Sequence, residues 1–266
     1  LLSGVPLVVK PATSTACLTQ RMVKDVVDAG VLPAGALSVV CGSSAGLLDA
    51  LEEFDVLSFT GSAETAATIR RHNAVAQRSV RVNIEADSIN SALLMPDANV
   101  GSPAFEALVK EVAREMTVKS GQKCTAIRRV FVPQSAFDAA AQAISERLSK
   151  TTVGNPRNET VRMGSLVSSA QLASVREGLA LLKSGAETLH DGAQHALVDA
   201  NADVACCVGP TLLGVRDGDS AAKVHNHEVF GPVATLVPYR DLQHAQGLVR
   251  RGRGSLVVSL YGSDEG

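Results

Sequence analysis

The apolar positions of this chain fall into two alternating patterns, short aliphatic runs and longer stretches in which apolar residues recur at helical spacing. In the first part of the chain, aliphatic runs predict strands over residues 5–10, 37–41, 56–60 and 80–85. Helical spacing predicts helices over residues 14–29, 45–53 and 62–72. Strands that alternate with helices in this way indicate parallel pairing through crossover connections, which is an α/β fold.

The same alternation continues through the rest of the chain. Helices are predicted over residues 103–119, 135–148 and 168–183, and extended segments over 89–95, 129–132, 211–215, 233–238 and 255–261. We therefore expect two α/β units without a flexible linker, residues 1–92 and residues 93–266. Gly121 breaks the helical pattern just before Cys124, so that cysteine is expected on a loop.

Composition agrees with an α/β fold, and the charge pattern limits the kinds of partner that we expect. Hydrophobic residues make up 45% of the 266 residues and aromatic residues only 3%, as in aliphatic strands covered on both faces. The 25 basic and 27 acidic side chains are interspersed and give a net charge of -2, so we expect neither nucleic acid nor an anionic membrane as a partner. No apolar run approaches the ~18 residues of a membrane span and no basic secretory segment opens the chain, so we expect a cytoplasmic protein.

Cys124 is the first candidate for chemistry. The chain holds 5 cysteines, an odd number without the spacing of a disulfide framework, so reduced thiols are expected. Lys123, Arg128 and Arg129 lie close to Cys124 in sequence, and a nearby cation would stabilise a nucleophilic thiolate. The alternative is a small thiol that packs in a loop without a chemical role.

Glu85, Ser62 and the segment 225–228 are further candidates for chemistry. Glu85 ends an aliphatic strand, where a carboxylate is either solvated or takes up a proton, as suits a general base; an ordinary strand-end glutamate is the alternative. Ser62, after Gly61, is placed to cap the next helix, whose free amides form a plausible phosphate seat. His225-Asn226-His227-Glu228 could suggest a metal site, but these ligands lie too close together to close one, and we predict none.

Four ordered motifs carry a resemblance to a known family. They are Val56-Leu57-Ser58-Phe59-Thr60-Gly61-Ser62, Glu85, Gly121-Gln122-Lys123-Cys124 and Glu228-Val229-Phe230-Gly231-Pro232-Val233. In order and approximate separation, and together with Val9-Lys10-Pro11-Ala12, they resemble the aldehyde dehydrogenase superfamily over essentially the whole chain. The resemblance implies part of a Rossmann-type cofactor domain followed by part of an α/β catalytic domain. Since the chain enters directly as a strand without Met, we expect a fragment of a longer enzyme.

The resemblance also implies roles for individual residues. Cys124 would be the nucleophile, and Glu85 would activate the water that cleaves the resulting thioester. Lys10 would contact the adenosine ribose, Gly61 and Ser62 the pyrophosphate, and Glu228 the nicotinamide ribose. Phe230 would pack nearby. The chain departs from the usual pattern in having Ala66 in place of a glycine in the phosphate-binding turn, and Ala86-Asp87 in place of two glycines after the base.

The residue three positions after Lys10 bears on cofactor choice. Relatives that prefer NAD often carry a glutamate there to bind the ribose hydroxyls, whereas this chain has Thr13. A neutral hydroxyl does not repel a 2′-phosphate and Lys10 would attract it, so we expect NADP, with NAD as the other option.

A narrower branch of the superfamily is similar in the segments 84–90, 121–129 and 163–167. This branch comprises the dehydrogenase of the benzoyl-CoA epoxidation pathway and the dehydrogenase half of the bifunctional phenylacetate ring-opening enzyme. It implies a small-molecule aldehyde linked to coenzyme A as the substrate, and a homo-oligomeric parent enzyme. Two alternatives stay open: an acylating dehydrogenase in which coenzyme A takes the acyl group, against which Glu85 argues, and a catalytically inactive structural fragment.

Overall fold

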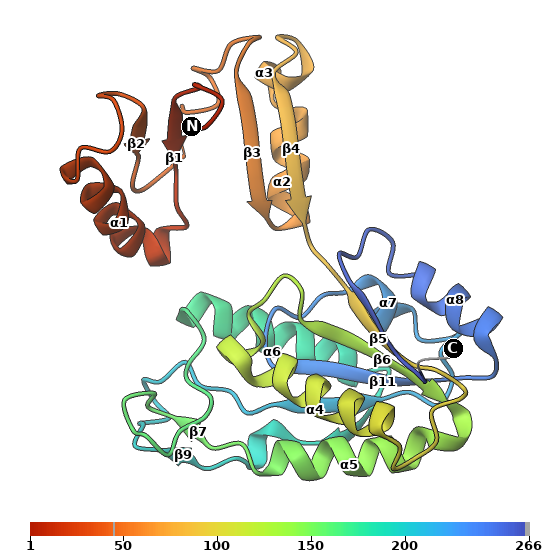
Figure 1. The fold of residues 1–266 in the computed structure, drawn as a ribbon. Coiled ribbons are helices and arrows are strands. Elements are labelled where there is room, and N and C mark those ends of the chain that lie inside the picture. Colours follow the sequence, from red (N-terminus) through yellow and green to blue (C-terminus); the bar gives the residue numbers. More distant parts are fainter. Residues whose placement is uncertain (45, 264–266) are drawn as a thin grey trace. The chain divides into compact units, whose positions relative to one another are not determined.

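The computed structural model describes residues 1–44 and 46–263, and it divides the chain into two compact units. The first unit is Leu1–Ala86 and the second is Asp87–Gly266 (Figure 1). The boundary expected at residue 92 falls inside strand β5 (Asn90–Leu94). Because β5 pairs with strands of the second unit on both of its edges, the whole strand belongs to that unit.

The first unit contains two pairs of parallel strands. In the first pair, β1 (Leu7–Val9) lies beside β2 (Leu37–Val39), and α1 (Ala16–Asp28) connects them. In the second pair, β3 (Val56–Gly61) lies beside β4 (Arg81–Ala86), and the connection contains α2 (Ala63–Arg71) and α3 (Asn73–Ala76). The strand–helix–strand order with parallel pairing is the α/β pattern that the sequence predicts.

The helix predicted over residues 45–53 is wrong for the part that the structure describes. Ala45 lies outside the described residues, and residues 46–50 form turns instead of a helix. The amides of Leu47 and Leu51 donate to the carbonyls three residues earlier, and Gly46 has a φ of 78°. Local bonds of this kind, beside a glycine in the left-handed region, favour consecutive turns over a helix that this short segment would have to nucleate.

The second unit is built on a six-stranded sheet in the order β12-β5-β6-β11-β10-β8. The strands not yet introduced are β12 (Val258–Tyr261), β6 (Ile127–Pro133), β11 (Val233–Tyr239), β10 (Thr211–Gly214) and β8 (Glu187–His190). All neighbouring pairs are parallel except β10 and β8. Two short strands, β7 (Val153–Gly154) and β9 (Leu197–Val198), pair separately.

Helices cover both faces of this sheet (Figure 1). One apolar cluster joins the sheet to α4 (Pro103–Thr117) and α5 (Phe137–Ser149). The other joins it to α6 (Ser169–Lys183), α7 (Ala222–Asn226) and α8 (Leu242–Arg250). Successive strand residues alternate between them, since Val130 and Val132 belong to the first cluster and Phe131 to the second. No helix in the described part of the chain is both long and apolar enough to cross a membrane.

A buried cation joins α8 to the central sheet. Arg129 is fully buried in β6, and its guanidinium donates to the carbonyls of Leu248, Val249 and Ile89 at 2.9 to 3.1 Å. It also lies 3.0 Å from Nδ1 of His225. Since the guanidinium can only donate, that nitrogen accepts, and the Nε2–H of His225 donates to a backbone carbonyl at 2.9 Å. Burial then lowers the pKa of His225 to about 4.

This lowered pKa predicts an acid-sensitive fold. The unfolded chain takes up a proton on His225 near its ordinary pKa of 6.5, whereas the folded chain resists it down to about 4. Stability should therefore fall as the pH is lowered through this window, by up to about 3 kcal/mol, and level off below it. Denaturant unfolding of the parent and of His225→Gln at several pH values tests this.

The control is His227→Gln, because His227 is exposed. We expect His225→Gln to flatten the pH dependence of the unfolding free energy between about pH 6.5 and 4, and His227→Gln to leave it as in the parent. Equal pH profiles for the parent and His225→Gln would contradict the assignment.

Candidate functional site

Cys124 lies on a loop between α4 and β6, as the sequence predicts, and its side chain is exposed. After α4 the chain makes a short 3-10 turn in which Lys119 and Ser120 have φ values of 53° and 54°. The amide of Ala126 then donates to the carbonyl of Lys123 at 3.2 Å, which closes a turn around the cysteine. The thiol is therefore presented to solvent at the tip of a short, bonded loop.

The three cations expected to stabilise the thiolate are engaged in contacts with other groups. Nζ of Lys123 lies 2.6 and 2.8 Å from the carboxylate oxygens of Glu115. Arg129 is buried against the backbone of α8, as described above. Arg128 is buried as well, and its bonds go to backbone carbonyls. The charge argument from sequence therefore does not describe the contacts of these three cations.

Arg128 holds the loop ahead of Cys124. Its Nη2 donates to the carbonyls of Gly121 and Lys123 at 2.8 and 3.3 Å, and its Nη1 donates to the carbonyl of Gly231 at 2.7 Å. The register between β5 and β6 shifts at this point, since Asn90 pairs with Ile127 and the next residue of β5 pairs with Arg129. This irregularity leaves Arg128 without a partner in β5, and such a bulge re-aims the side chain.

Asn90, at the start of β5, holds the other side of the same turn. Its Nδ2 donates to the carbonyl of Cys124 at 2.7 Å and to that of Ala126 at 3.0 Å. Asn90 is fully buried. Arg128 and Asn90 together therefore engage backbone carbonyls on both sides of the cysteine.

Glu228 is a largely buried carboxylate that lies beside Arg128. Its Oε2 accepts from the amide of Ser88 at 3.0 Å, and its Oε1 lies 3.6 Å from Nε of Arg128, beyond hydrogen-bonding distance. Within the described chain, neither Oε1 of Glu228 nor Nε of Arg128 has a hydrogen-bond partner. Burial raises the pKa of the Glu228 carboxyl, and the charge of Arg128 opposes that shift. A buried carboxylate oxygen is thus left with free acceptor capacity.

Phe230 belongs to the same cluster. The guanidinium carbon of Arg128 lies 5.6 Å from the centre of the Phe230 ring, a cation–π distance, and the ring is partly exposed. The carbonyl of Phe230 accepts from Nε2 of Gln171 at 2.7 Å. The structure therefore brings the Cys124 turn, Glu228 and Phe230 together within the second unit, around Arg128.

The remaining predicted site residues lie in the first unit. Lys10 is exposed after β1, where its Nζ donates to its neighbour Pro11, and Thr13 is exposed at the start of a 3-10 turn. Gly61 ends β3, and Ser62 caps α2 by accepting from the amide of Thr65 at 3.2 Å, as predicted.

Glu85 lies near the end of β4, beside that cap. It pairs in register with Thr60, the residue before Gly61, and it is exposed in its own unit. The structure therefore gathers Gly61, Ser62 and Glu85 at the carboxyl end of the β3–β4 pair.

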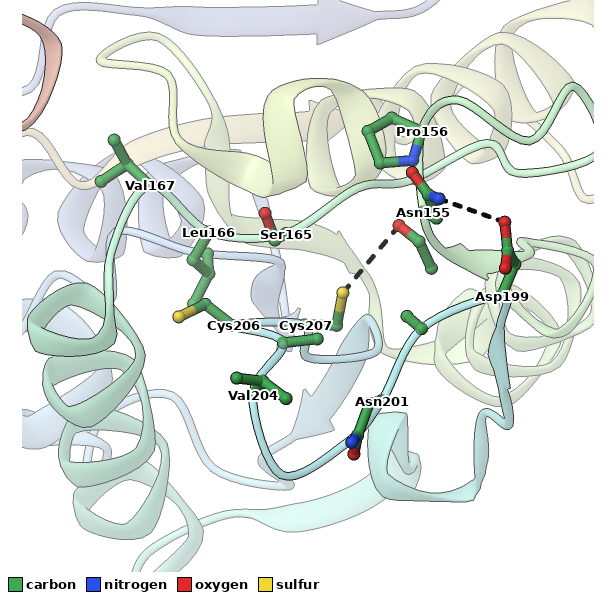
Figure 2. A pocket seen from close by; sticks show the side chains of 13 residues that line it. Asn155, Pro156, Ser165, Leu166, Val167, Asp199, Asn201, Val204, Cys206 and Cys207 are labelled. Carbon is green, nitrogen blue, oxygen red and sulfur yellow. Dashed lines mark hydrogen bonds between the residues drawn. The ribbon is translucent and has the colours of Figure 1, made fainter.

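Two other features carry no catalytic assignment. Within residues 1–44 and 46–263, no three His, Cys, Asp or Glu side chains gather in a way that could hold a metal ion. A hollow of about 450 Å³ is lined by the segments 154–156, 165–167, 199–201 and 204–207, whose side chains are drawn in Figure 2. In it, the thiol of Cys207 donates to the carbonyl of Gly154 at 3.9 Å, and burial raises the pKa of that thiol. A thiol held protonated in this way is a poor nucleophile.

Sequence reasoning missed the two buried side chains that hold the turn. Asn90 did carry a signal, because it is a polar residue in an otherwise aliphatic strand, and a buried amide there must find several partners. For Arg128, the sequence suggests only a positive charge near Cys124. Its three carbonyl contacts depend on the register shift between β5 and β6, which the sequence does not reveal.

The comparisons with known proteins agree on one family. Residues 1–266 match the model of the aldehyde dehydrogenase family. The chain is 57% identical, over 99% of its length and 52% of the relative's, to a 3,4-dehydroadipyl-CoA semialdehyde dehydrogenase of Aromatoleum evansii. The chain thus spans about half the length of this relative.

Solved structures share the fold. A variant of betaine aldehyde dehydrogenase from Staphylococcus aureus, in complex with NAD+, is 25% identical with a TM-score of 0.83, over 98% of this chain and 51% of that one. Gamma-glutamyl-gamma-aminobutyraldehyde dehydrogenase from Burkholderia cenocepacia is 24% identical with a TM-score of 0.81, over 97% of this chain and 50% of that one. These matches agree with the α/β architecture described above.

The close approach of two loops at Gly121 predicts that a side chain at this position destabilises the fold. Gly121 has a φ of 69°, and a Cβ there would lie 2.2 Å from the carbonyl oxygen of Gly231, a backbone atom that cannot swing away. We expect Gly121→Ala to lower the free energy of unfolding by at least about 1–3 kcal/mol in denaturant titrations. The matched control is Gly247→Ala in α8, where nothing lies within 4 Å and a gain of about 0.5–1 kcal/mol is expected. Equal stability of the two variants would contradict this account.

Proposed function

The chain belongs to the aldehyde dehydrogenase family, and on this premise we propose that the protein containing it oxidises a coenzyme A-linked semialdehyde from aromatic-compound degradation to the carboxylic acid. The observation that carries the chemistry is the exposed Cys124 thiol on a turn whose carbonyls are held from both sides. The substrate class is supported by the name of the relative that is 57% identical.

In this proposal Cys124 is the nucleophile. Its thiolate adds to the aldehyde carbon and forms a thiohemiacetal. A nicotinamide cofactor, when bound, would accept the hydride from this carbon, and the acyl group would then remain on Cys124 as a thioester. Glu85 takes a proton from water, the water oxygen attacks the thioester, and the bond between carbon and sulfur breaks to release the acid. Holding the aldehyde on the protein converts an encounter into an intramolecular reaction, and the thioester is reactive enough for water to open.

The residues present fit a nicotinamide dinucleotide. Gly61 and Ser62 lie exposed at the start of α2, where the helix dipole and amides favour a pyrophosphate. Oε1 of Glu228 accepts no hydrogen bond within the described chain and is an acceptor suited to a ribose hydroxyl. The partly exposed ring of Phe230, near Arg128, offers an apolar surface. Lys10 is exposed, and its ammonium group is a donor suited to a ribose or phosphate oxygen.

NADP is the cofactor that we propose within this class. Lys10 and Thr13 are both exposed at the end of β1 and the turn that follows it, and neither carries a negative charge. A 2′-phosphate would therefore meet a cation and a neutral hydroxyl there, without repulsion. NAD, which is bound in the betaine aldehyde dehydrogenase structure, is the alternative.

Steady-state kinetics on the intact enzyme test the substrate and the cofactor together. We measure kcat/KM for a coenzyme A-linked semialdehyde and for propanal, each with NADP and with NAD. The expected order places the linked semialdehyde with NADP first, because the 57% identical relative is named for such a substrate and Lys10 and Thr13 do not repel a 2′-phosphate. Higher kcat/KM for propanal would remove the substrate assignment, and higher kcat/KM with NAD would remove the cofactor assignment.

The hydrolytic role of Glu85 distinguishes this proposal from an acylating dehydrogenase. Glu85→Gln keeps the size of the side chain and removes the base, so steady-state acid formation should fall by on the order of 10²–10⁴ while the thioester on Cys124 accumulates. Quenched reactions analysed by mass spectrometry measure both quantities.

The matched control is Glu53→Gln, an exposed glutamate of the same unit, which should behave as the parent does. If Glu85→Gln forms acid as fast as the parent, hydrolysis does not depend on this residue. If free coenzyme A must be added before product leaves the parent enzyme, the acylating reaction replaces the hydrolytic one.

A further inference from the structure

Asn90 is hydrogen-bonded to the peptide group of Cys124, the proposed nucleophile. Nδ2 of Asn90 donates to the carbonyl of Cys124 at 2.7 Å and to the carbonyl of Ala126 at 3.0 Å. Because the amide of Ala126 also closes the turn onto Lys123, these bonds restrain the residue that carries the thiol and the residue two positions later.

The other end of the same amide is fully occupied. Oδ1 of Asn90 accepts from the hydroxyl of Ser88 at 2.6 Å and from the amides of Leu256 and Val257 at 3.1 and 2.9 Å. Three donors around Oδ1 and two carbonyls around Nδ2 allow only one orientation of the side chain. Asn90 is fully buried, so water cannot replace any of these partners.

The backbone amides that bond Oδ1 of Asn90 belong to the segment that enters the sheet. Leu256 and Val257 lie directly before β12, and β12 pairs with β5 in parallel. The amide of Leu256 donates to the hydroxyl of Ser88 as well, at 3.0 Å. The Oδ1 end of Asn90 is thus bonded to the entry of a sheet strand, while its Nδ2 end extends to the turn that carries the thiol.

From this geometry we infer that Asn90 is a positioning residue, which fixes the Cys124 turn against the sheet so that the thiol points in one direction before any substrate arrives. The inference rests on the proposed function, in which Cys124 is the nucleophile. Misplacing a reacting group by about 1 Å can cost on the order of 10² in rate, so a restraint applied directly to the residue that carries the thiol acts on kcat.

Asn90→Asp is the sharpest test, because it keeps the shape and the acceptor. The new carboxylate can still accept from Ser88, Leu256 and Val257 through one oxygen. Its other oxygen faces the carbonyl oxygens of Cys124 and Ala126, to which Asn90 donates, and it cannot donate to them. Only the protonated acid can donate to one of them. The deficit in kcat relative to the parent should therefore be on the order of tenfold or more near pH 9 and smaller near pH 6.

The control removes a different buried hydrogen bond of the same sheet. Thr211 of β10 is buried, and its hydroxyl accepts from the amide of Gly192 at 3.1 Å. Thr211→Val deletes this bond without any contact to the cysteine turn. Both variants should unfold at lower temperature than the parent, but only Asn90→Asp should lower kcat.

The readout is NADP reduction by the intact enzyme with a coenzyme A-linked semialdehyde as the substrate, over a pH profile and well below the unfolding temperature of each variant. KM for the semialdehyde and for NADP should stay within about twofold of the parent values, since positioning affects the bond-forming step. The inference is overturned if kcat of Asn90→Asp matches the parent, if its deficit does not shrink towards pH 6, or if Thr211→Val loses as much kcat. Absence of turnover in the parent with this semialdehyde and with propanal would instead overturn the proposed function.

Discussion

Most of the second unit's candidate site depends on one constraint, the capture of backbone carbonyls around Cys124 by two buried side chains. Arg128 engages the carbonyls before the cysteine, and Asn90 engages those at and after it. A carbonyl with a fixed donor fixes the plane of its peptide, and successive fixed planes leave a loop little freedom. The left-handed backbone at Lys119 and Ser120 persists under this restraint, since such conformations last only where the surroundings over-determine them.

The sheet explains why those two side chains meet at one turn. Asn90 opens β5 and Arg128 lies near the start of β6, and the two strands are neighbours. The register shift between them removes Arg128 from the ladder and frees its side chain for the loop. Arg129, one residue later, is directed instead to the backbone of α8 and to His225. Adjacent arginines on one strand thus hold two different parts of the unit in place.

The sequence predicted well what depends on local pattern. The α/β class, the parallel pairing of the first strands, the cap at Ser62 and the loop around Cys124 all follow from periodicity and from turn residues. It failed where pattern is weak or partners are distant. The helix expected from Ala45 gives way to turns beside Gly46, and α8 was not predicted, although Leu242, Ala245 and Leu248 have helical spacing after the cap at Asp241. The contacts of Arg128 and Asn90 cross strands and could not be inferred from spacing.

Within the described chain, Oε1 of Glu228 accepts no hydrogen bond, and this has a consequence for how the protein responds to ligands. A buried acceptor without a hydrogen-bond donor typically costs about 1–3 kcal/mol, and the ion pair with Nε of Arg128 at 3.6 Å offsets part of that cost. A ligand that brings a hydroxyl to this oxygen recovers that cost, so part of its affinity is stored in the free protein as an unmade hydrogen bond. The contact would also add to the ligand's stabilisation of the fold against heat, because a ligand stabilises whichever state it binds.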